Sequence, residues 1–174
     1  MLFRSDDPVG RLGAALADAG FAVATDAVVA AFAAEVRFYR ANHDGGRDDS
    51  SLRSLRRDCA AVFAAALPVT PPADITEEIL AAGLRYRTFD DVASVLDALA
   101  AAGCALAVAS NWDASLPRVL DAAGILDRFA EVSVSAVVGA RKPDSAVFRH
   151  ALEALDVAPE DAAHVGDEDR KSVV

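Results

Sequence analysis

Cysteine and long apolar runs are scarce in this sequence of 174 residues. Only Cys59 and Cys104 occur, without a CxxC pair, so neither a zinc site nor a disulfide framework is indicated. Both lie in apolar stretches, and we expect them to be small core residues rather than reactive thiols. No apolar run approaches membrane-spanning length and no secretory pattern opens the chain, so a cytoplasmic location is expected.

Basic residues are also fewer than acidic ones. The chain has 27 acidic against 17 basic residues and a formal net charge of −10. An acidic surface repels phosphate backbones, which argues against nucleic acid and anionic membrane as partners. A small phosphorylated substrate stays compatible, because a local cation or metal ion can reverse the field. The 53% apolar fraction is enough to form a buried core. The length suits one domain, or a core domain with a small insertion.

The two halves of the sequence differ in the spacing of their apolar residues. Helical spacing of apolar residues dominates the first half, and we predict helices over 8–19, 26–41, 50–66 (capped by Ser50 or Ser51) and 74–83 (opened by a capping box). The second half alternates predicted helices (90–102, 113–123 and 145–155, the last capped by Asp144) with short apolar strands (104–109, 131–135 and 162–166). This alternation predicts an α/β fold with a parallel sheet and right-handed crossovers, and a boundary near residues 84–90.

Polar side chains stand where each of the three predicted strands ends. Ser110 and Asn111 follow the first strand, Lys142 follows the second, and Asp167 follows the third. Ligands of an open parallel sheet bind at the carboxyl ends of its strands. A hydroxyl and an amide suit phosphoryl oxygens, a lysine brings a point charge, and a carboxylate suits Mg²⁺.

Each of these features alone has an ordinary structural explanation. Ser110 and Asn111 suit a strand-to-helix cap, Lys142 a solvated loop, and Asp167 a turn after a glycine. Lys142 is nonetheless one of only two lysines in an arginine-rich chain, the other being Lys171. The common position of all three groups at strand ends favours a single site around one phosphoryl group.

The same segments resemble the haloacid dehalogenase-like (HAD) hydrolase superfamily, and within it the members with a helical cap. Residues 108–113 resemble the second motif of that family, residues 139–148 the third, and residues 164–167 the start of the fourth. The resemblance implies a Rossmann-like parallel sheet core over 85–168 with an all-helical cap over 9–84. In this interpretation the core is partial.

The family mechanism implied by this resemblance is hydrolysis through an aspartyl-phosphate. Ser110 and Asn111 would hold the phosphoryl oxygens, Lys142 would neutralise charge, and Asp167 would help to hold Mg²⁺. The substrate would be a small phosphorylated metabolite. Catalysis of this kind combines a covalent intermediate with fixed electrostatic stabilisation.

Two departures from the family pattern affect these expectations. No apolar strand ending in Asp-x-Asp precedes residue 8, so the nucleophile-bearing first strand is expected to be absent; Asp6 and Asp7 are poor substitutes. The fourth motif stops soon after Asp167, and residues 169–174 look like the translation of a sequencing adaptor, hence a non-native tail. We therefore expect a fragment that folds poorly and is inactive, because unpaired strand edges and a missing nucleophile are both costly.

Three functions remain open at this stage. The first is the Mg²⁺-dependent phosphatase; the second is a metal-free 2-haloacid dehalogenase; the third is a non-catalytic binding module. The second predicted helix and the break after it contain four candidate substrate contacts: Arg37, Tyr39, Arg40 and His43. A solvated helix face is the more ordinary interpretation of these residues. The sequence leaves the oligomeric state unknown.

Overall fold

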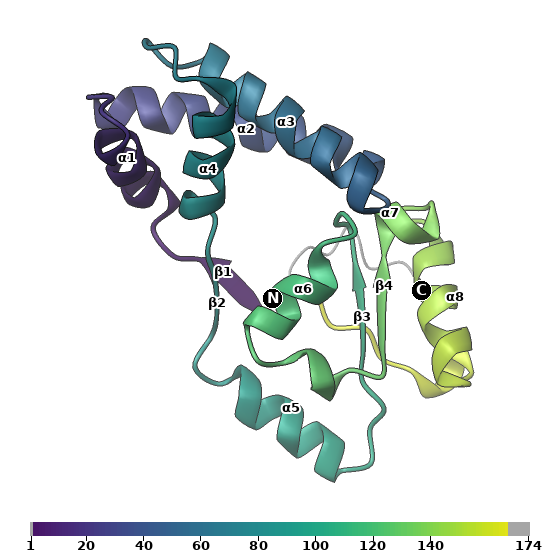
Figure 1. The fold of residues 1–174 in the computed structure, drawn as a ribbon. Coiled ribbons are helices and arrows are strands. Elements are labelled where there is room, and N and C mark those ends of the chain that lie inside the picture. Colours follow the sequence, from purple (N-terminus) through teal and green to yellow (C-terminus); the bar gives the residue numbers. More distant parts are fainter. Residues whose placement is uncertain (1, 167–174) are drawn as a thin grey trace.

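The computed structural model describes residues 2–166, and Figure 1 shows a helical group joined to a small α/β unit. The helices are α1 (Pro8–Asp18), α2 (Thr25–Asn42), α3 (Asp49–Ala65), α4 (Ala73–Gly83), α5 (Val92–Ala101), α6 (Leu116–Ala122), α7 (Ser135–Val138) and α8 (Ser145–Leu155). Short 3-10 turns are η1 (His43–Gly45), η2 (Leu126–Arg128) and η3 (Pro159–Asp161). The strands are β1 (Phe3–Ser5), β2 (Tyr86–Thr88), β3 (Ala107–Ser110) and β4 (Glu131–Val134).

Helices α1 to α4 form the helical half of the molecule around one apolar cluster. Leu12, Leu16 and Phe63 are fully buried in this cluster. The remaining buried members come from α2, α3, α4 and the turn after α3: Val28, Ala31, Leu52, Leu55, Cys59, Ala60, Leu67, Ile79 and Leu80. The apolar spacing in the first half of the sequence therefore produces a compact helical group, and Cys59 lies in its core as predicted.

Capping explains where several of these helices begin. Asp144 accepts a hydrogen bond from the Ala146 amide at the start of α8, as predicted. Helix α3 is capped by Asp48, not by Ser50 or Ser51; Ser51 instead completes a capping box with Asp48. The capping box predicted for α4 is wrong, because the Thr76 hydroxyl donates to the Pro72 carbonyl at 2.9 Å from inside the helix.

The chain passes between its two halves twice, through β1 and β2. These strands pair antiparallel, with Phe3 opposite Thr88 and Ser5 opposite Tyr86. In Figure 1 this ribbon lies between the helical half and the rest of the molecule. Neither strand was predicted, since three residues show no usable alternation.

The sheet half contains the parallel pair β3 and β4, in register from Ala107 opposite Glu131 to Ser110 opposite Val134. Helix α8 contacts both strands, and α6 contacts β4. A second apolar cluster fills this half: Val92, Leu96, Leu116, Leu120, Ile125, Val134 and Ala136. The predicted α/β class with a small parallel sheet is confirmed.

Some predictions for the sheet half are wrong in detail. Strand β3 begins at Ala107 rather than at Cys104, and Cys104 is exposed instead of buried. Residues 162–166 are not a strand. A strand forms only where a neighbouring strand shares its backbone hydrogen bonds. Within residues 2–166 the parallel sheet consists of β3 and β4 alone, so the apolar run at 162–166 has no strand partner.

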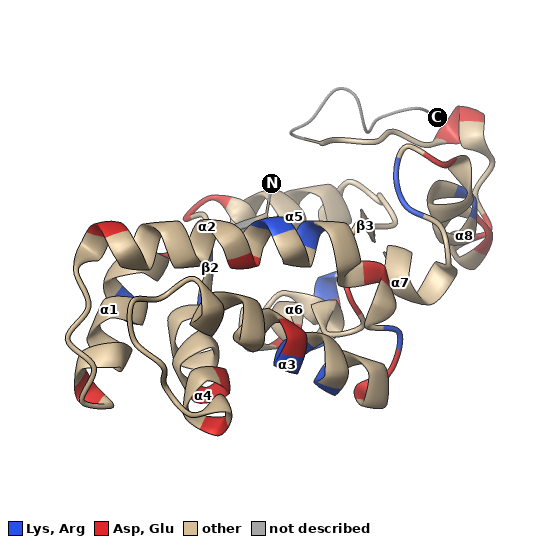
Figure 2. Ribbon diagram, turned by 90° about the horizontal axis from the view of Figure 1, so that it is seen from above, with Lys and Arg blue, Asp and Glu red and all other residues tan. Residues whose placement is uncertain are grey.

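Within residues 2–166 no helix combines the length and the apolar character needed to cross a membrane. Charge is distributed rather than concentrated on one element. Figure 2 shows acidic residues on helices of both halves of the molecule, among them α4 and α8.

Candidate active site

The structure brings the first two predicted site segments into direct contact. Asn111 follows the last residue of β3, and its amide nitrogen donates to the Lys142 carbonyl at 3.1 Å. Its amide oxygen accepts from the Lys142 backbone N–H at 2.6 Å. Both groups of this side chain therefore hold the backbone of Lys142, although 31 residues separate the two positions.

The loop that carries Lys142 is fixed at both of its ends. Gly139 ends α7 with φ at 81°, a left-handed conformation that a glycine adopts without a steric penalty. The Asp144 backbone N–H donates to the Arg141 carbonyl at 2.8 Å, and the Lys142–Pro143 peptide bond is cis. Ser110 stands at the end of β3, opposite Val134 in the register.

The third predicted segment approaches the same loop through His164. The His164 ring packs edge-on against Phe148 of α8, with 4.9 Å between ring centroids. Burial and then the charge of Lys142 lower the pKa of His164. Asp167, the predicted metal ligand, lies outside the described residues.

Asp44, in η1 of the helical half, forms a bridge to the sheet half. One carboxylate oxygen accepts from the Ser135 hydroxyl at 2.7 Å, and the other accepts from the Arg141 guanidinium at 2.6 Å. Burial would raise the pKa of Asp44, but these hydrogen bonds from Ser135 and Arg141 hold it below its usual value. The Asp44 bridge thus connects the helical half to the residue that precedes Lys142.

A second contact between the halves joins α2 to the segment after β3. The Tyr39 hydroxyl donates to Asp113 at 2.9 Å, and the other Asp113 oxygen accepts from the Ser115 amide at 2.8 Å. The Ala114 amide donates to the Gly46 carbonyl at 2.8 Å. Burial, with the neighbouring Asp113 carboxylate, raises the pKa of Tyr39, so the phenol remains protonated and donates.

Between the halves lies a cleft of about 880 Å³, here called the central cleft. Its floor includes Trp112, Asp113 and Ser115, directly after Asn111, and helices α2, α3, α4 and α6 supply its walls. Its other polar and aromatic lining residues are Glu35, Tyr39, Arg56, Cys59, Glu77, Glu78, Arg85, Tyr86 and Arg118. A concave space beside convergent polar groups is the usual setting of a small-molecule site.

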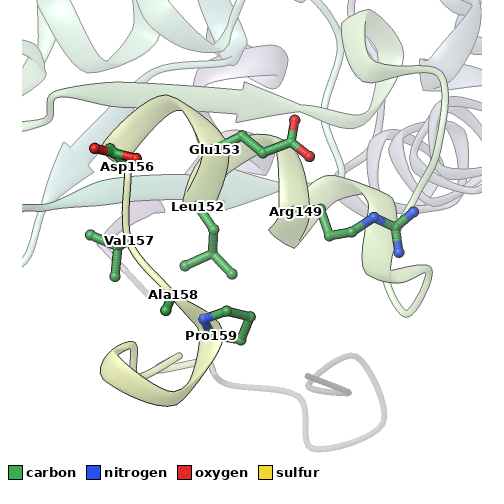
Figure 3. A pocket seen from close by; sticks show the side chains of 7 residues that line it. All are labelled: Arg149, Leu152, Glu153, Asp156, Val157, Ala158 and Pro159. Atoms are coloured by element: carbon green, nitrogen blue, oxygen red, sulfur yellow. The ribbon is translucent and has the colours of Figure 1, made fainter.

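A second hollow, of about 540 Å³, lies at the far end of α8 (Figure 3). Leu152, Val157 and Pro159 are among its lining residues, and none of the predicted site residues lines it. It is therefore separate from the contacts between Asn111 and Lys142.

The candidate contacts of the second helix divide into two kinds. Arg37 and Arg40 are exposed, which fits a solvated helix face. Tyr39 lines the central cleft, and His43 is buried with its ring 5.7 Å from that of Tyr39.

The two early aspartates have structural roles that account for them. Asp7 caps α1 by accepting from the Gly10 amide at 3.0 Å, and Asp6 lies 3.8 Å from the Arg11 guanidinium.

No cluster of three or more His, Cys, Asp or Glu side chains suited to a metal ion occurs within residues 2–166. The described groups alone therefore do not fit a magnesium site, and we derive no reaction step through the metal. Asp44, Ser135 and Asp113 were not predicted as site residues; the hydrogen bonds from Ser135 to Asp44 and from Tyr39 to Asp113 exist only once the two halves are docked, and no local pattern indicates them.

Comparison with known proteins identifies the family. The sequence profile described as haloacid dehalogenase-like hydrolase matches residues 9–170. Haloacid dehalogenase-like hydrolase domain-containing protein 3 of Mus musculus is 36% identical over 99 residues, covering 57% of this chain and 39% of the mouse protein. A phosphoserine phosphatase of Thermus thermophilus is 41% identical over 90 residues, covering 51% of this chain and 36% of that protein. The aligned segments thus span less than half the length of these relatives.

Solved structures show the same fold. A HAD phosphatase from Thermococcus onnurineus superposes with a TM-score of 0.56 at 20% identity, covering 98% of this chain and 74% of that one. An L-2-haloacid dehalogenase from Xanthobacter autotrophicus gives 0.63 at 19% identity, covering 91% and 62%. At such identities the likeness describes the fold alone. The profile match over most of the sequence is decisive: the chain belongs to the haloacid dehalogenase-like hydrolase family.

Proposed function

We propose that this site serves a Mg²⁺-dependent phosphatase that hydrolyses a small phosphorylated metabolite through an aspartyl-phosphate. The observation that carries the proposal is the mutual hydrogen bonding of Asn111 and the Lys142 backbone at the end of β3. It sets an amide and the base of a lysine side chain beside each other at a strand end, where a phosphoryl group can accept from both. The phosphoserine phosphatase among the relatives favours phosphate over other substrates.

Each predicted residue receives a role in this proposal. The Asn111 amide nitrogen carries two hydrogens, of which the bond to Lys142 uses one, so the other serves a phosphoryl oxygen. The Ser110 hydroxyl offers a further donor, and the Lys142 ammonium neutralises the charge that develops on transfer. Residues 9–84 act as the cap and residues 85–168 as the partial core.

The proposed reaction needs a nucleophile and a metal in addition to the groups of residues 2–166. Asp44 and Asp113, the two carboxylates in contact with the site segments, already accept hydrogen bonds from protein groups. Asp167 is the residue to which we assign the metal. We expect the 174-residue chain to show negligible turnover of p-nitrophenyl phosphate, since loss of a nucleophile costs about 10⁶-fold in other covalent enzymes.

Binding of inorganic phosphate to the purified chain tests the proposal without requiring turnover. We expect calorimetric titration to show binding that Lys142→Met weakens at least about tenfold, which corresponds to about 1.4 kcal/mol. Lys171→Met is the matched control, because it removes the only other lysine. Equal phosphate affinity in both variants would remove Lys142 from the site.

Two further titrations separate the alternatives. Mg²⁺ should strengthen phosphate binding, and Asp167→Asn should abolish that increment. A chain that binds 2-chloropropionate but not phosphate would support the dehalogenase instead, and a chain that binds neither would support a non-catalytic module.

A further inference from the structure

Asp44, in the turn η1 of the helical half, contacts two separate segments of the sheet half. Its Oδ1 atom accepts from the Ser135 hydroxyl at 2.7 Å, and its Oδ2 atom accepts from Arg141 Nε at 2.6 Å. The Nε2 atom of His43 lies 3.3 Å from the same Oδ1. A carboxylate can serve several donors at once, because each of its oxygens has two lone pairs. One side chain of the helical half can therefore hold both segments.

The contact with Ser135 leads to the segment after β3. Ser135 is fully buried, and its hydroxyl oxygen accepts from the Trp112 backbone N–H at 3.2 Å. The hydroxyl also lies 3.3 Å from the Trp112 carbonyl, but its single hydrogen goes to the nearer and ionised oxygen of Asp44. Trp112 directly follows Asn111. The Ser135 hydroxyl thus connects Asp44 with the segment that carries Asn111.

The contact with Arg141 leads to the loop of Lys142, the next residue along the chain. The Lys142 backbone is held by the Asn111 side chain at 2.6 and 3.1 Å. The two routes from Asp44 therefore meet at the contact between Asn111 and Lys142. Hydrogen bonds and chain neighbours together form a closed ring of six residues: Asp44, Ser135, Trp112, Asn111, Lys142 and Arg141.

The turn that carries Asp44 approaches the segment after β3 closely. A Cβ atom at Gly46 would lie 3.0 Å from the Asp113 Cβ atom, which is tighter than most side-chain contacts. The Gly46 carbonyl also accepts from the Ala114 amide at 2.8 Å. The small residue at position 46 thus lets the two backbones meet. Asp44 reaches its partners where this turn docks, and separation of the halves would remove it from both.

We propose that Asp44 is a positioning residue, through which docking of the helical half orders the segments of Asn111 and Lys142. Asp44 is the one member of the ring from the helical half, so the ring closes only when the halves are docked. A closed network restrains its members more than separate pairs do. Where it concerns phosphate, this assignment rests on the proposed function. By linkage, a phosphate bound at Asn111 and Lys142 would in turn favour the docked state.

Exchange of the Lys142 amide hydrogen tests the ordering without any ligand, because this amide donates to Asn111 within the ring. Asp44→Asn keeps the shape of the side chain and removes its charge. We expect the protection of the Lys142 amide, measured by NMR, to fall at least about threefold more than that of amides in the middle of α3 and α8. Those amides report on unfolding of the two halves, so a merely structural effect would lower all protection alike.

Two further variants define the effect. Asp49→Asn is the matched control, because Asp49 also joins the halves, by accepting from Arg118 at 2.9 Å, but lies outside the ring. It should leave the relative protection of the Lys142 amide unchanged. Ser135→Ala opens the ring on its other side and retains the Asp44 carboxylate. It should lower the relative protection of the Lys142 amide, so the test does not depend on Asp44→Asn alone.

The affinity for inorganic phosphate gives a second readout, whose sign is informative. Removal of a negative charge strengthens the binding of an anion if charge alone matters. Positioning predicts the opposite, because binding must then immobilise a disordered loop. We expect the Kd for phosphate, measured by calorimetry, to rise about threefold in Asp44→Asn. Asp49→Asn should leave it nearly unchanged.

Unchanged relative protection of the Lys142 amide in both Asp44→Asn and Ser135→Ala would overturn the assignment, and so would tighter phosphate binding in Asp44→Asn. The results also distinguish this proposal from the phosphatase. Phosphate binding that depends on Lys142 but not on Asp44 removes the positioning role alone. Loss of Lys142 protection in a variant of a chain that binds no phosphate removes the phosphatase and retains the role of Asp44.

Discussion

Asn111 and Lys142 illustrate how one side chain can position another. Asn111 uses both its oxygen and its nitrogen on the Lys142 backbone. An amide can satisfy a backbone N–H and a backbone carbonyl at once, as a neighbouring strand would. The contact therefore fixes the origin of the lysine side chain through the Lys142 backbone.

The charge of Lys142 should be measurable through His164. Burial lowers the pKa of His164, and Lys142 lowers it further because two cations repel each other. We predict that Lys142→Met raises the pKa of His164, measured by NMR titration of the three histidines. Lys171→Met, which removes the other lysine, should leave the His164 titration unchanged. An unaltered His164 titration in Lys142→Met would show that the third segment does not approach the site.

Some residues of the candidate site can be predicted from the sequence and others cannot. Lys142 is conspicuous as a lysine among arginines, and Asn111 follows a recognisable apolar run. Asp44 and Asp113 have no comparable signal. Asp44 lies in a stretch whose sequence predicts a helix break, and Asp113 lies in the segment before α6. Their contacts with the other half depend on which surfaces meet, and this is a property of docking rather than of local sequence.

At the scale of elements, the apolar spacing predicts the helices well because each helix buries one face in a single cluster. Helices α1 and α8 start at the predicted residues and end within a residue of the predicted C-termini. Strands are less predictable, because a strand is defined by its neighbour. The run at 162–166 has strand-like composition without a partner in the described part of the chain, and β1 and β2 are too short to show a pattern.

The Asp44 bridge is an element-scale contact whose strength should depend on pH. Its carboxylate has a lowered pKa in the folded chain, so its contribution is fully present above the unfolded pKa of about 3.9. That contribution is lost as the pH falls through the folded value. We predict that Asp44→Asn lowers the free energy of unfolding by about 1 kcal/mol at pH 7, measured by urea denaturation. The difference from the unaltered chain should shrink towards pH 3.

Asp49 offers a matched control for this measurement. Its carboxylate also joins the two halves, since the Arg118 guanidinium donates to it at 2.9 Å, but both side chains are mostly exposed. Exposed pairs contribute little, so Asp49→Asn should leave the stability nearly unchanged. If both variants lose equal stability at every pH, the Asp44 bridge has no special role between the halves.

At the scale of the whole molecule, two apolar clusters are joined by the β1–β2 ribbon, the Asp44 bridge and the Tyr39–Asp113 contact. The ribbon is covalent and continuous, whereas the other two contacts are a few hydrogen bonds. Movement of the helical half about the ribbon would therefore break those contacts, together with the Asp49–Arg118 pair and the hydrogen bond from the Ala114 amide to the Gly46 carbonyl. Because the Asp44 bridge and the Tyr39–Asp113 contact are adjacent to the segments of Lys142 and Asn111, such movement would change access to the candidate site directly.

The sheet half is the part of the molecule most exposed to misassociation. Within residues 2–166 its parallel sheet consists of β3 and β4 alone, and a two-stranded sheet is marginal in water. The unpaired edge of β3 can pair with another chain, and its residues Ala107–Ser110 carry no charge that would oppose this. We predict concentration-dependent self-association of the purified chain, measured by size-exclusion chromatography with light scattering over a hundredfold range of concentration. The helical half, with its own buried cluster, should retain its helical circular dichroism in the associated material. A monomer at all concentrations that melts in one cooperative transition would show that two strands and their covering helices are sufficient, and that the edge of β3 is protected in solution.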